Sequence, residues 1–262
     1  MKFTEKDIAN GFCGNITKND VFIGLSTSSP KNYPIIAYPE EYKETELLMV
    51  ECTQINGLKP TEQKKLIEKW CKAFPLLEKV KYLHFVSRVP QNIFESVCMM
   101  TNLSALSIKW SSIKDISSLS TLKNIRYFHL GSSSQVESID ILRNMENLIY
   151  LSLENIKRIN DIKPLSSLKN LVGLSICGSM WTTQVVETLE PLKYLQKLQY
   201  LNLINLKTND KTIKFLEEIK SLNYINGPYF YPKGFKLFSE FDYLKKVNPN
   251  LIINHYYGNK EE

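Results

Sequence analysis

The feature that most constrains the fold of this 262-residue chain is a short phrase that recurs at even spacing. The phrase consists of an apolar residue, two variable residues, an apolar residue, one variable residue and a last apolar residue. It starts at Val80, Leu103, Ile125, Leu148, Leu171, Leu198 and, in decayed form, Leu222. The steps between starts are 23, 22, 23, 23, 27 and 24 residues. Such a period predicts a repeat architecture in which each copy forms the same structural unit.

The alternating part of the phrase predicts a short strand that directs its leucines toward a core. One such strand cannot cover its own apolar face, so neighbouring copies stack as a parallel sheet with helical or 3₁₀ returns on the other side. Parallel strands lie about 4.8 Å apart and the returning segments are bulkier, so the stack curves with the sheet on its concave surface. We therefore expect an α/β solenoid over residues 80–226.

The second half of the repeat adds a family resemblance. Residues 113–125 (IKDISSLSTLKNI) and 159–171 (INDIKPLSSLKNL) follow the wording I-x-D-I-x-P-L-x-x-L-x-N-L. Together with the LxxLxL phrase, this wording resembles the short 22-residue leucine-rich repeats of bacterial internalin-like proteins, which implies a leucine-rich-repeat solenoid. The usual Asn at the ninth position is replaced by Arg88, Ser111, Ser133, Ile156, Ser179 and Leu206, with Asn155 and Asn205 one place early. We expect less regular convex turns in consequence.

Residues 46–79 are predicted to form an atypical first repeat. It combines a strand over 46–53 with an amphipathic helix from Pro60 to about Phe74. The inward side chains expected on the strand are Leu47, Val50 and Cys52. This segment therefore begins the solenoid with a unit longer than the repeats that follow.

Irregular caps are predicted at both ends. Residues 1–45 form the N-terminal cap, with a candidate strand at 21–25. Residues 227–262 form the C-terminal cap, with a helix near 237–247 and a closing strand at 251–253. Terminal units of a solenoid need a polar outer face, which fits their irregular sequence.

Two of the longer repeats have room for true helices on the convex side. Residues 185–197 and 212–221 show helical apolar spacing. Asn209 and Asp210 are candidate caps for the second of these helices.

Composition excludes several classes of protein. Hydrophobic residues make up 43% of the chain and charged residues 23%, which is typical of a globular protein and not of a disordered or fibrous one. The longest apolar runs, such as 47–50, are too short for a membrane-spanning helix, and residues 1–12 carry charges where a signal peptide is apolar. Five scattered cysteines without a C-x-x-C pair favour a reducing compartment. We expect a cytoplasmic protein without a membrane partner.

The net charge of +6 arises mainly in the repeats. Residues 80–226 carry 17 basic and 12 acidic side chains, which are dispersed and form no run. A nucleic-acid site would gather lysines and arginines on one face. Nucleic acid is therefore a disfavoured partner, and binding through the basic convex side stays open as an alternative.

Positions three, five and seven of the phrase alternate with the core positions and face the concave side. Position three holds five tyrosines, interrupted by Ala105 and Gly173, where we expect dips between the rings. Position five is polar throughout. The residues expected to contact a protein partner are Tyr82, His84, Lys109, Trp110, Tyr127, His129, Tyr150, Ser152, Glu154, Tyr200, Asn202 and Tyr224.

The tyrosine column has two explanations that do not exclude one another. Tyrosine offers a large contact area with little rotamer entropy to lose, and it is enriched at interface hot spots. It also packs well against strand neighbours, a purely structural role. The loop at 227–235 (GPYFYPKGF) is open in the same way: Tyr229, Phe230 and Tyr231 form either a binding loop or an aromatic plug over the end of the core.

Catalytic motifs are missing from the sequence. His84 and His129 lie on strands separated by an intervening one, about 10 Å apart, which is too far for one zinc ion. No HExxH, GxSxG or phosphate-binding glycine loop occurs, and no base adjoins the outward-facing Cys177. We expect no enzyme activity, no metal and no cofactor.

These features predict a non-enzymatic module that is monomeric alone and binds another protein through its concave face. A rigid solenoid limits the ordering cost of association. One version is a bacterial immunity or inhibitor protein that occludes a toxin, and an adaptor or scaffold protein is the alternative. The identity of the partner is not encoded in any motif.

Overall fold

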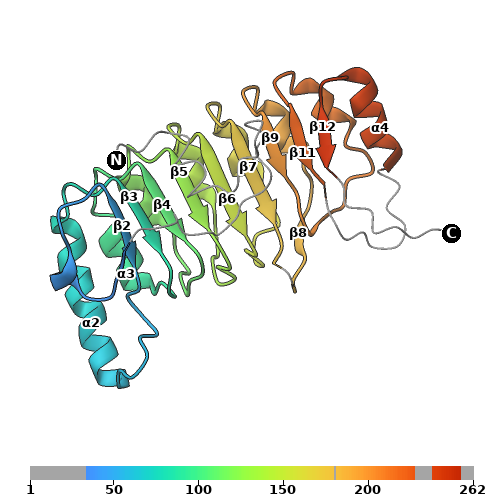
Figure 1. Ribbon diagram of the computed structural model, residues 1–262. Helices are drawn as coiled ribbons and strands as arrows, with labels where there is room; N and C mark the ends of the chain where they lie inside the picture. Colours follow the sequence, from blue (N-terminus) through green and yellow to red (C-terminus); the bar gives the residue numbers. More distant parts are fainter. Residues whose placement is uncertain (1–33, 180, 228–237, 255–262) are drawn as a thin grey trace.

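The computed structural model describes residues 34–179, 181–227 and 238–254. The chain forms a ten-stranded parallel sheet whose strands follow the chain order from β1 to β12, apart from β8 and β10, which pair as a separate two-stranded sheet (Figure 1). The strands of the large sheet are β1 (Ile35–Ile36), β2 (Leu47–Val50), β3 (Tyr82–Phe85), β4 (Ala105–Ile108), β5 (Tyr127–Leu130), β6 (Tyr150–Glu154), β7 (Gly173–Cys177), β9 (Tyr200–Asn202), β11 (Tyr224–Asn226) and β12 (Ile252–Asn254). The parallel solenoid predicted from the repeat phrase is confirmed.

The register of the strands follows the phrase residue by residue. Leu106 pairs with Phe128, Phe128 with Leu151 and Leu151 with Leu174, so equivalent positions of successive repeats lie side by side. These side chains are 0–1% exposed and belong to one continuous hydrophobic core. Burial of the stacked apolar rows therefore stabilises the solenoid, as a single copy could not.

The returning segments of the middle repeats are short 3₁₀ helices. They are η3 (Ser117–Thr121), η4 (Asp140–Asn144), η5 (Lys163–Ser167), η6 (Glu190–Tyr194) and η7 (Lys214–Glu218). Each buries a central leucine. Leu142 in η4 and Leu165 in η5 are examples, and both are fully buried. One leucine every turn is enough to close the core, so the return needs no full α-helix.

The prediction of true helices at 185–197 and 212–221 was wrong. In the first segment the extra residues form β8 (Gln184–Val186), which pairs with β10 (Leu206–Thr208), and only η6 is helical. In the second segment only η7 is helical. Asp210 does not cap that helix. Its carboxylate instead accepts hydrogen bonds from the backbone N–H of Leu189 (2.7 Å) and from Thr188 Oγ1 (2.6 Å), one repeat earlier.

The first repeat has the predicted strand and helix. Helix α2 (Pro60–Ala73) begins with Pro60 and continues into η2 (Phe74–Leu76), and α3 (Gln91–Val97) follows β3. Trp70 is fully buried, stacks on Phe74 with a ring-centroid distance of 4.9 Å, and donates its indole N–H to the Ala37 carbonyl at 2.8 Å. This aromatic packing closes the N-terminal part of the core.

The core-facing side chains of β2, the strand of the first repeat, differ by one residue from the prediction. Leu48, Val50 and Cys52 belong to the core cluster, whereas Leu47 does not. Leu47 pairs in register with Tyr82, so it shares the opposite face of the sheet. The strict alternation of a strand allows Leu48 and Val50 on one side and excludes Leu47.

The C-terminal helix and strand lie within one residue of the places predicted for them. Helix α4 (Phe238–Val247) packs at the end of the stack, and β12 closes the sheet beside β11 (Figure 1). The short η1 (Pro39–Glu41) lies near the other end, between β1 and β2. The candidate strand at 21–25 and the loop residues Tyr229, Phe230 and Tyr231 lie outside the described residues. Within the described part, no helix has the length and apolar character needed to cross a membrane.

An asparagine ladder connects the turns that precede the strands. Asn102, Asn124, Asn147 and Asn170 each donate a side-chain N–H to a backbone carbonyl one repeat earlier, at 2.8–3.1 Å. These residues are the Asn of the L-x-N-L wording and not the ninth-position Asn of the family. The ladder satisfies turn carbonyls that the strands leave unpaired.

Candidate protein-binding face

The concave face, defined here as the sheet face opposite the core, carries the tyrosine column. Tyr82, Ala105, Tyr127, Tyr150, Gly173, Tyr200 and Tyr224 occupy one continuous register row across seven strands. Tyr82, Tyr150 and Tyr200 are half-buried, whereas Tyr127 and Tyr224 are only 3% exposed. The column predicted from the phrase therefore exists, with unequal access to solvent along it.

The centre of the column is a stacked pair. The rings of Tyr127 and Tyr150 lie with centroids 5.5 Å apart and planes 9° from parallel. The Arg126 guanidinium lies 5.8 Å from the Tyr127 ring centroid, within the range of a cation–π contact. Both rings are thus held in one orientation.

The dip predicted at Gly173 does not exist. A Cβ at that position would lie 2.4 Å from Cδ1 and 2.6 Å from Cε1 of Tyr150, so the ring occupies the space above the glycine. Any side chain there would displace the ring. Gly173 therefore serves as the seat that lets Tyr150 lie against the sheet.

The polar column beside the tyrosines is buried. Its seven side chains are 0–3% exposed: His84, Ser107, His129, Ser152, Ser175, Asn202 and Asn226. Cross-strand hydrogen bonds join some of them: one between His129 Nδ1 and Ser152 Oγ at 2.9 Å, and one that Asn202 Nδ2 donates to Ser175 Oγ at 2.9 Å. Most of this column is thus internal structure of the face.

Burial keeps both histidines of this column neutral. It lowers the pKa of His84 to about 4, with a smaller contribution from the nearby Lys109 charge. It lowers the pKa of His129 to about 3, with a smaller contribution from His84. Neutral imidazoles act at pH 7 as one donor and one acceptor and add no charge to the face.

The ends of the central strands add charged and aromatic groups. Lys109 is exposed, and its ammonium lies 5.2 Å from the Trp110 ring centroid. Trp110 is half-buried and its indole N–H donates to Gln54 Oε1 at 3.2 Å. Burial raises the pKa of the half-buried Glu154, against the opposing influence of a Ser132 hydrogen bond and the Lys109 charge. These groups form the polar border of the concave face.

Cys177 is not placed as a nucleophile. It is 9% exposed, and burial raises the pKa of its thiol to about 12, although the Ser175 hydroxyl opposes this shift. A nucleophilic cysteine needs a lowered pKa. Among the residues that the structure describes, no three His, Cys, Asp or Glu side chains are grouped as metal ligands, and Cys52, Cys71, Cys98 and Cys177 are free thiols.

One prominent residue escaped the sequence analysis. Trp181 follows β7 and is 89% exposed. Its signal in the sequence was the 27-residue repeat from Leu171, whose extra residues were assigned to a helix. The unusual length of this repeat, and not its apolar periodicity, is the sequence feature that indicates the exposed loop.

Comparisons with known proteins support the fold and extend no further. Neither a protein-family model nor a curated protein sequence matches the chain. An internalin (inlF) from Listeria monocytogenes is similar in structure, with a TM-score of 0.53 and 19% identity over 68% of this chain and 54% of that one. The chain therefore spans about half the length of that internalin.

Two further solved structures are similar to the same extent. Internalin C2 (inlC2) from Listeria monocytogenes gives a TM-score of 0.53 and 21% identity over 70% of this chain and 72% of that one. A leucine-rich-repeat protein from Leptospira interrogans gives 0.50 and 19%, over 70% and 50% of the two chains. By its fold, the chain is a leucine-rich-repeat solenoid of the kind found in the internalins.

Proposed function

We propose that this chain is a non-enzymatic module that binds another protein through its concave face. The observation that carries the proposal is the Tyr127–Tyr150 stack, seated on Gly173 at the centre of the sheet. Its rings are already ordered, so a partner that packs on the half-buried Tyr150 does not bear the cost of ordering that side chain. Tyrosine in such a position is typical of interface hot spots.

Two buried polar atoms lie unpaired beneath the tyrosine column. His129 Nε2 and Asn202 Oδ1 have no hydrogen-bond partner among the described residues. A buried polar atom without a partner costs about 1–3 kcal/mol. Because both side chains are only 3% exposed, a docked partner does not reach these atoms, and they carry no part of the proposal.

The accessible contact residues in this proposal are fewer than the sequence suggested. Tyr82, Tyr150 and Tyr200 supply aromatic area, and Lys109, Trp110 and Glu154 border them. His84, Tyr127, His129, Ser152, Asn202 and Tyr224 are 0–3% exposed and shape the face from beneath. We propose a direct role in binding for the first group and a positioning role for the second.

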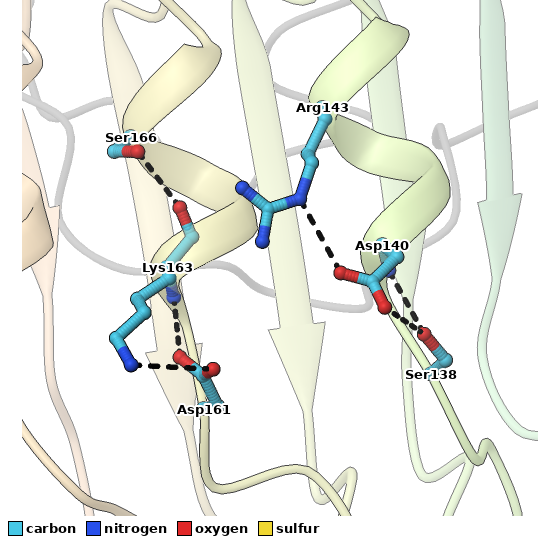
Figure 2. A network of polar contacts seen from close by, with 6 residues as sticks. All are labelled: Ser138, Asp140, Arg143, Asp161, Lys163 and Ser166. Atoms are coloured by element: carbon cyan, nitrogen blue, oxygen red, sulfur yellow. Dashed lines mark hydrogen bonds and ion pairs between the residues drawn. The ribbon is translucent and has the colours of Figure 1, made fainter.

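The nucleic-acid alternative has less support on the convex side. Three basic side chains of the central returns are paired locally. Arg143 Nε bonds Asp140 at 3.3 Å, and Lys163 Nζ lies 3.9 Å from Asp161 (Figure 2). Arg158 pairs with Glu137 at 2.8 Å in the same manner. A phosphate-binding track needs cations that are available to phosphates.

The proposal has two finer versions, which differ in what binding does to the partner. An immunity or inhibitor protein would cover the active site of a toxin, and an adaptor or scaffold would join two proteins without inhibiting either. We favour the inhibitor because the preformed concave face suits one-to-one occlusion of an active site. We also propose a reducing cytoplasm as its compartment, in which Cys52, Cys71, Cys98 and Cys177 would stay the free thiols that they are in the structure.

The test is affinity capture from the source organism followed by binding measurements with the purified partner. We expect Tyr150→Ala to weaken binding by about tenfold or more, with Tyr150→Phe much closer to wild type. Lys163→Ala on the convex side serves as the control and should bind normally. The proposal fails if Tyr150→Ala binds as wild type, or if Lys163→Ala abolishes binding with a steep salt dependence.

A further inference from the structure

The 27-residue repeat exposes apolar side chains at the edge of the solenoid, away from the concave face. Trp181 is 89% exposed, more than any other large hydrophobic residue that the structure describes, and Val185 on β8 is 45% exposed. Within the described part, no ring or cation packs on the Trp181 indole. The fold therefore gains little from this tryptophan.

The loop that carries Trp181 is held in place. Asn205 donates its side-chain N–H to the carbonyls of Ser179 (2.7 Å) and Thr182 (3.1 Å), and its Oδ1 accepts a hydrogen bond from Thr183 Oγ1 at 2.9 Å. The Ser179 N–H also bonds the Thr182 carbonyl at 2.8 Å, closing the turn around the tryptophan.

Two backbone positions show how closely this loop is fitted. Asn205 adopts a positive φ of 50°, a conformation that non-glycine residues rarely take. A Cβ on Gly178 would lie 2.1 Å from the Thr182 carbonyl oxygen and 2.6 Å from that of Asn205, so only glycine fits there. These contacts hold the loop in one conformation and keep Trp181 at the surface.

Lysines from the two adjoining repeats flank the apolar pair. Lys207 on β10 is exposed and pairs in register with Val185. Lys157 is exposed on the segment that runs beside the loop, where the Gln184 side chain donates to the Ile159 carbonyl at 2.8 Å. Neither lysine forms an ion pair with any residue that the structure describes. The acidic neighbours are Glu187, just after β8, and Asp210, just after β10, and both lie at the other end of these parallel strands from Trp181.

We propose that Trp181, Val185, Lys157 and Lys207, here called the tryptophan edge, form a second docking site for an acidic peptide segment of a partner protein. The segment would place an apolar side chain against Trp181 and Val185 and carboxylates beside the two lysines. Trp on a rigid loop supplies contact area at a low entropy cost, and complementary charge selects the partner. This site is separate from the concave face.

Tyr194 provides a matched control. It is 51% exposed on η6 of the same repeat, and its ring lies 5.2 Å and 5.5 Å from the ammonium groups of Lys169 and Lys193. It is an exposed aromatic residue with basic neighbours, but those neighbours already cover its ring. Tyr194→Ala therefore removes a similar side chain without touching the tryptophan edge.

The test selects random peptides displayed on phage against the full chain and measures the enriched peptides by fluorescence anisotropy. We expect acidic peptides with an apolar residue, bound about tenfold or more weakly by Trp181→Ala. Tyr194→Ala and Tyr150→Ala should bind them as wild type, which separates this site from the concave one. Lys157→Glu with Lys207→Glu should weaken binding and reduce its salt dependence.

Three results would overturn the proposal. They are the absence of any enriched peptide, enriched peptides that bind Trp181→Ala as wild type, and enriched peptides without acidic residues. Sedimentation with vesicles of phosphatidylserine and phosphatidylcholine tests a membrane instead. Wild-type binding to the vesicles that Trp181→Ala loses would assign the tryptophan edge to lipid and also overturn the proposal.

Discussion

Both faces of the sheet contain fully buried side chains, but these side chains are buried by different means. On the core face, Leu151 and Leu153 are 0–1% exposed among apolar neighbours. On the concave face, Ser152 lies between them in sequence and is 0% exposed, yet it is hydrogen-bonded to His129. Low exposure alone therefore does not identify the core. The chemistry of the neighbours separates the face that holds the solenoid together from the face that we propose binds a partner.

The largest effect is expected from a core truncation. Leu151→Ala removes a fully enclosed side chain, and the rigid stack on either side can close the space only in part, so we expect a loss of about 2–5 kcal/mol in the free energy of unfolding. Urea denaturation measures it. Ser152→Ala, one residue away, should cost clearly less. Equal losses at the two positions would break the distinction between the faces.

A pH titration should reveal the buried histidines of the concave face. The pKa is about 4 for His84 and about 3 for His129 in the folded chain, below the value of about 6.5 expected when unfolded. The unfolded chain then binds protons first, so stability falls as the pH drops below about 6.5 and is insensitive to these groups above it. Between pH 7.5 and 5.5 we expect a loss of about 1–3 kcal/mol in urea denaturation.

The control for this titration is His129→Gln, which should lose less stability over the same pH range than wild type. Glu154, whose pKa is raised by burial, titrates in the opposite sense and is present in both proteins. If wild type and His129→Gln show the same pH dependence, the imidazole is accessible to protons in the folded state and the concave face is more open than its burial indicates.

A smaller effect is expected where the tyrosine ring meets its glycine seat. Gly173→Ala places a methyl group where the Tyr150 ring lies, and we expect a loss of about 1–2 kcal/mol from overpacking. The near-ultraviolet circular dichroism of the stacked tyrosines should change with it. In Tyr150→Ala the same glycine substitution should be nearly neutral, a coupling that a double-mutant cycle measures. Additive effects of the two substitutions would show that the Tyr150 ring does not rest on Gly173.

The smallest effect is expected on the convex side. Lys163→Ala removes an exposed side chain whose ion pair with Asp161 spans 3.9 Å. Such surface pairs contribute little, so the thermal midpoint should stay within experimental error of wild type. A shift as large as that of Gly173→Ala would show that the convex network of Figure 2 supports the fold.

The repeat phrase predicted most of the strands because alternation along a strand is a local property. Tyr82–Phe85 and Tyr127–Leu130 form at their predicted places and in the predicted parallel order. The returns were harder to predict. Apolar residues at 185–197 fit a helical spacing, but a segment that joins two parallel strands can bury the same side chains through η6 and β8. Periodicity cannot distinguish these two solutions.

The sequence by itself determined the architecture of the solenoid and the composition of its two faces, because a two-residue period assigns each side chain to one face. Only the tertiary structure decided how those side chains are used. It placed the Tyr150 ring over Gly173, linked His129 to Ser152, and set Trp181 on a turn held by Asn205 from the next repeat. Each of these contacts joins residues 23 to 26 positions apart in the sequence. They depend on the register between neighbouring strands, which no single repeat contains.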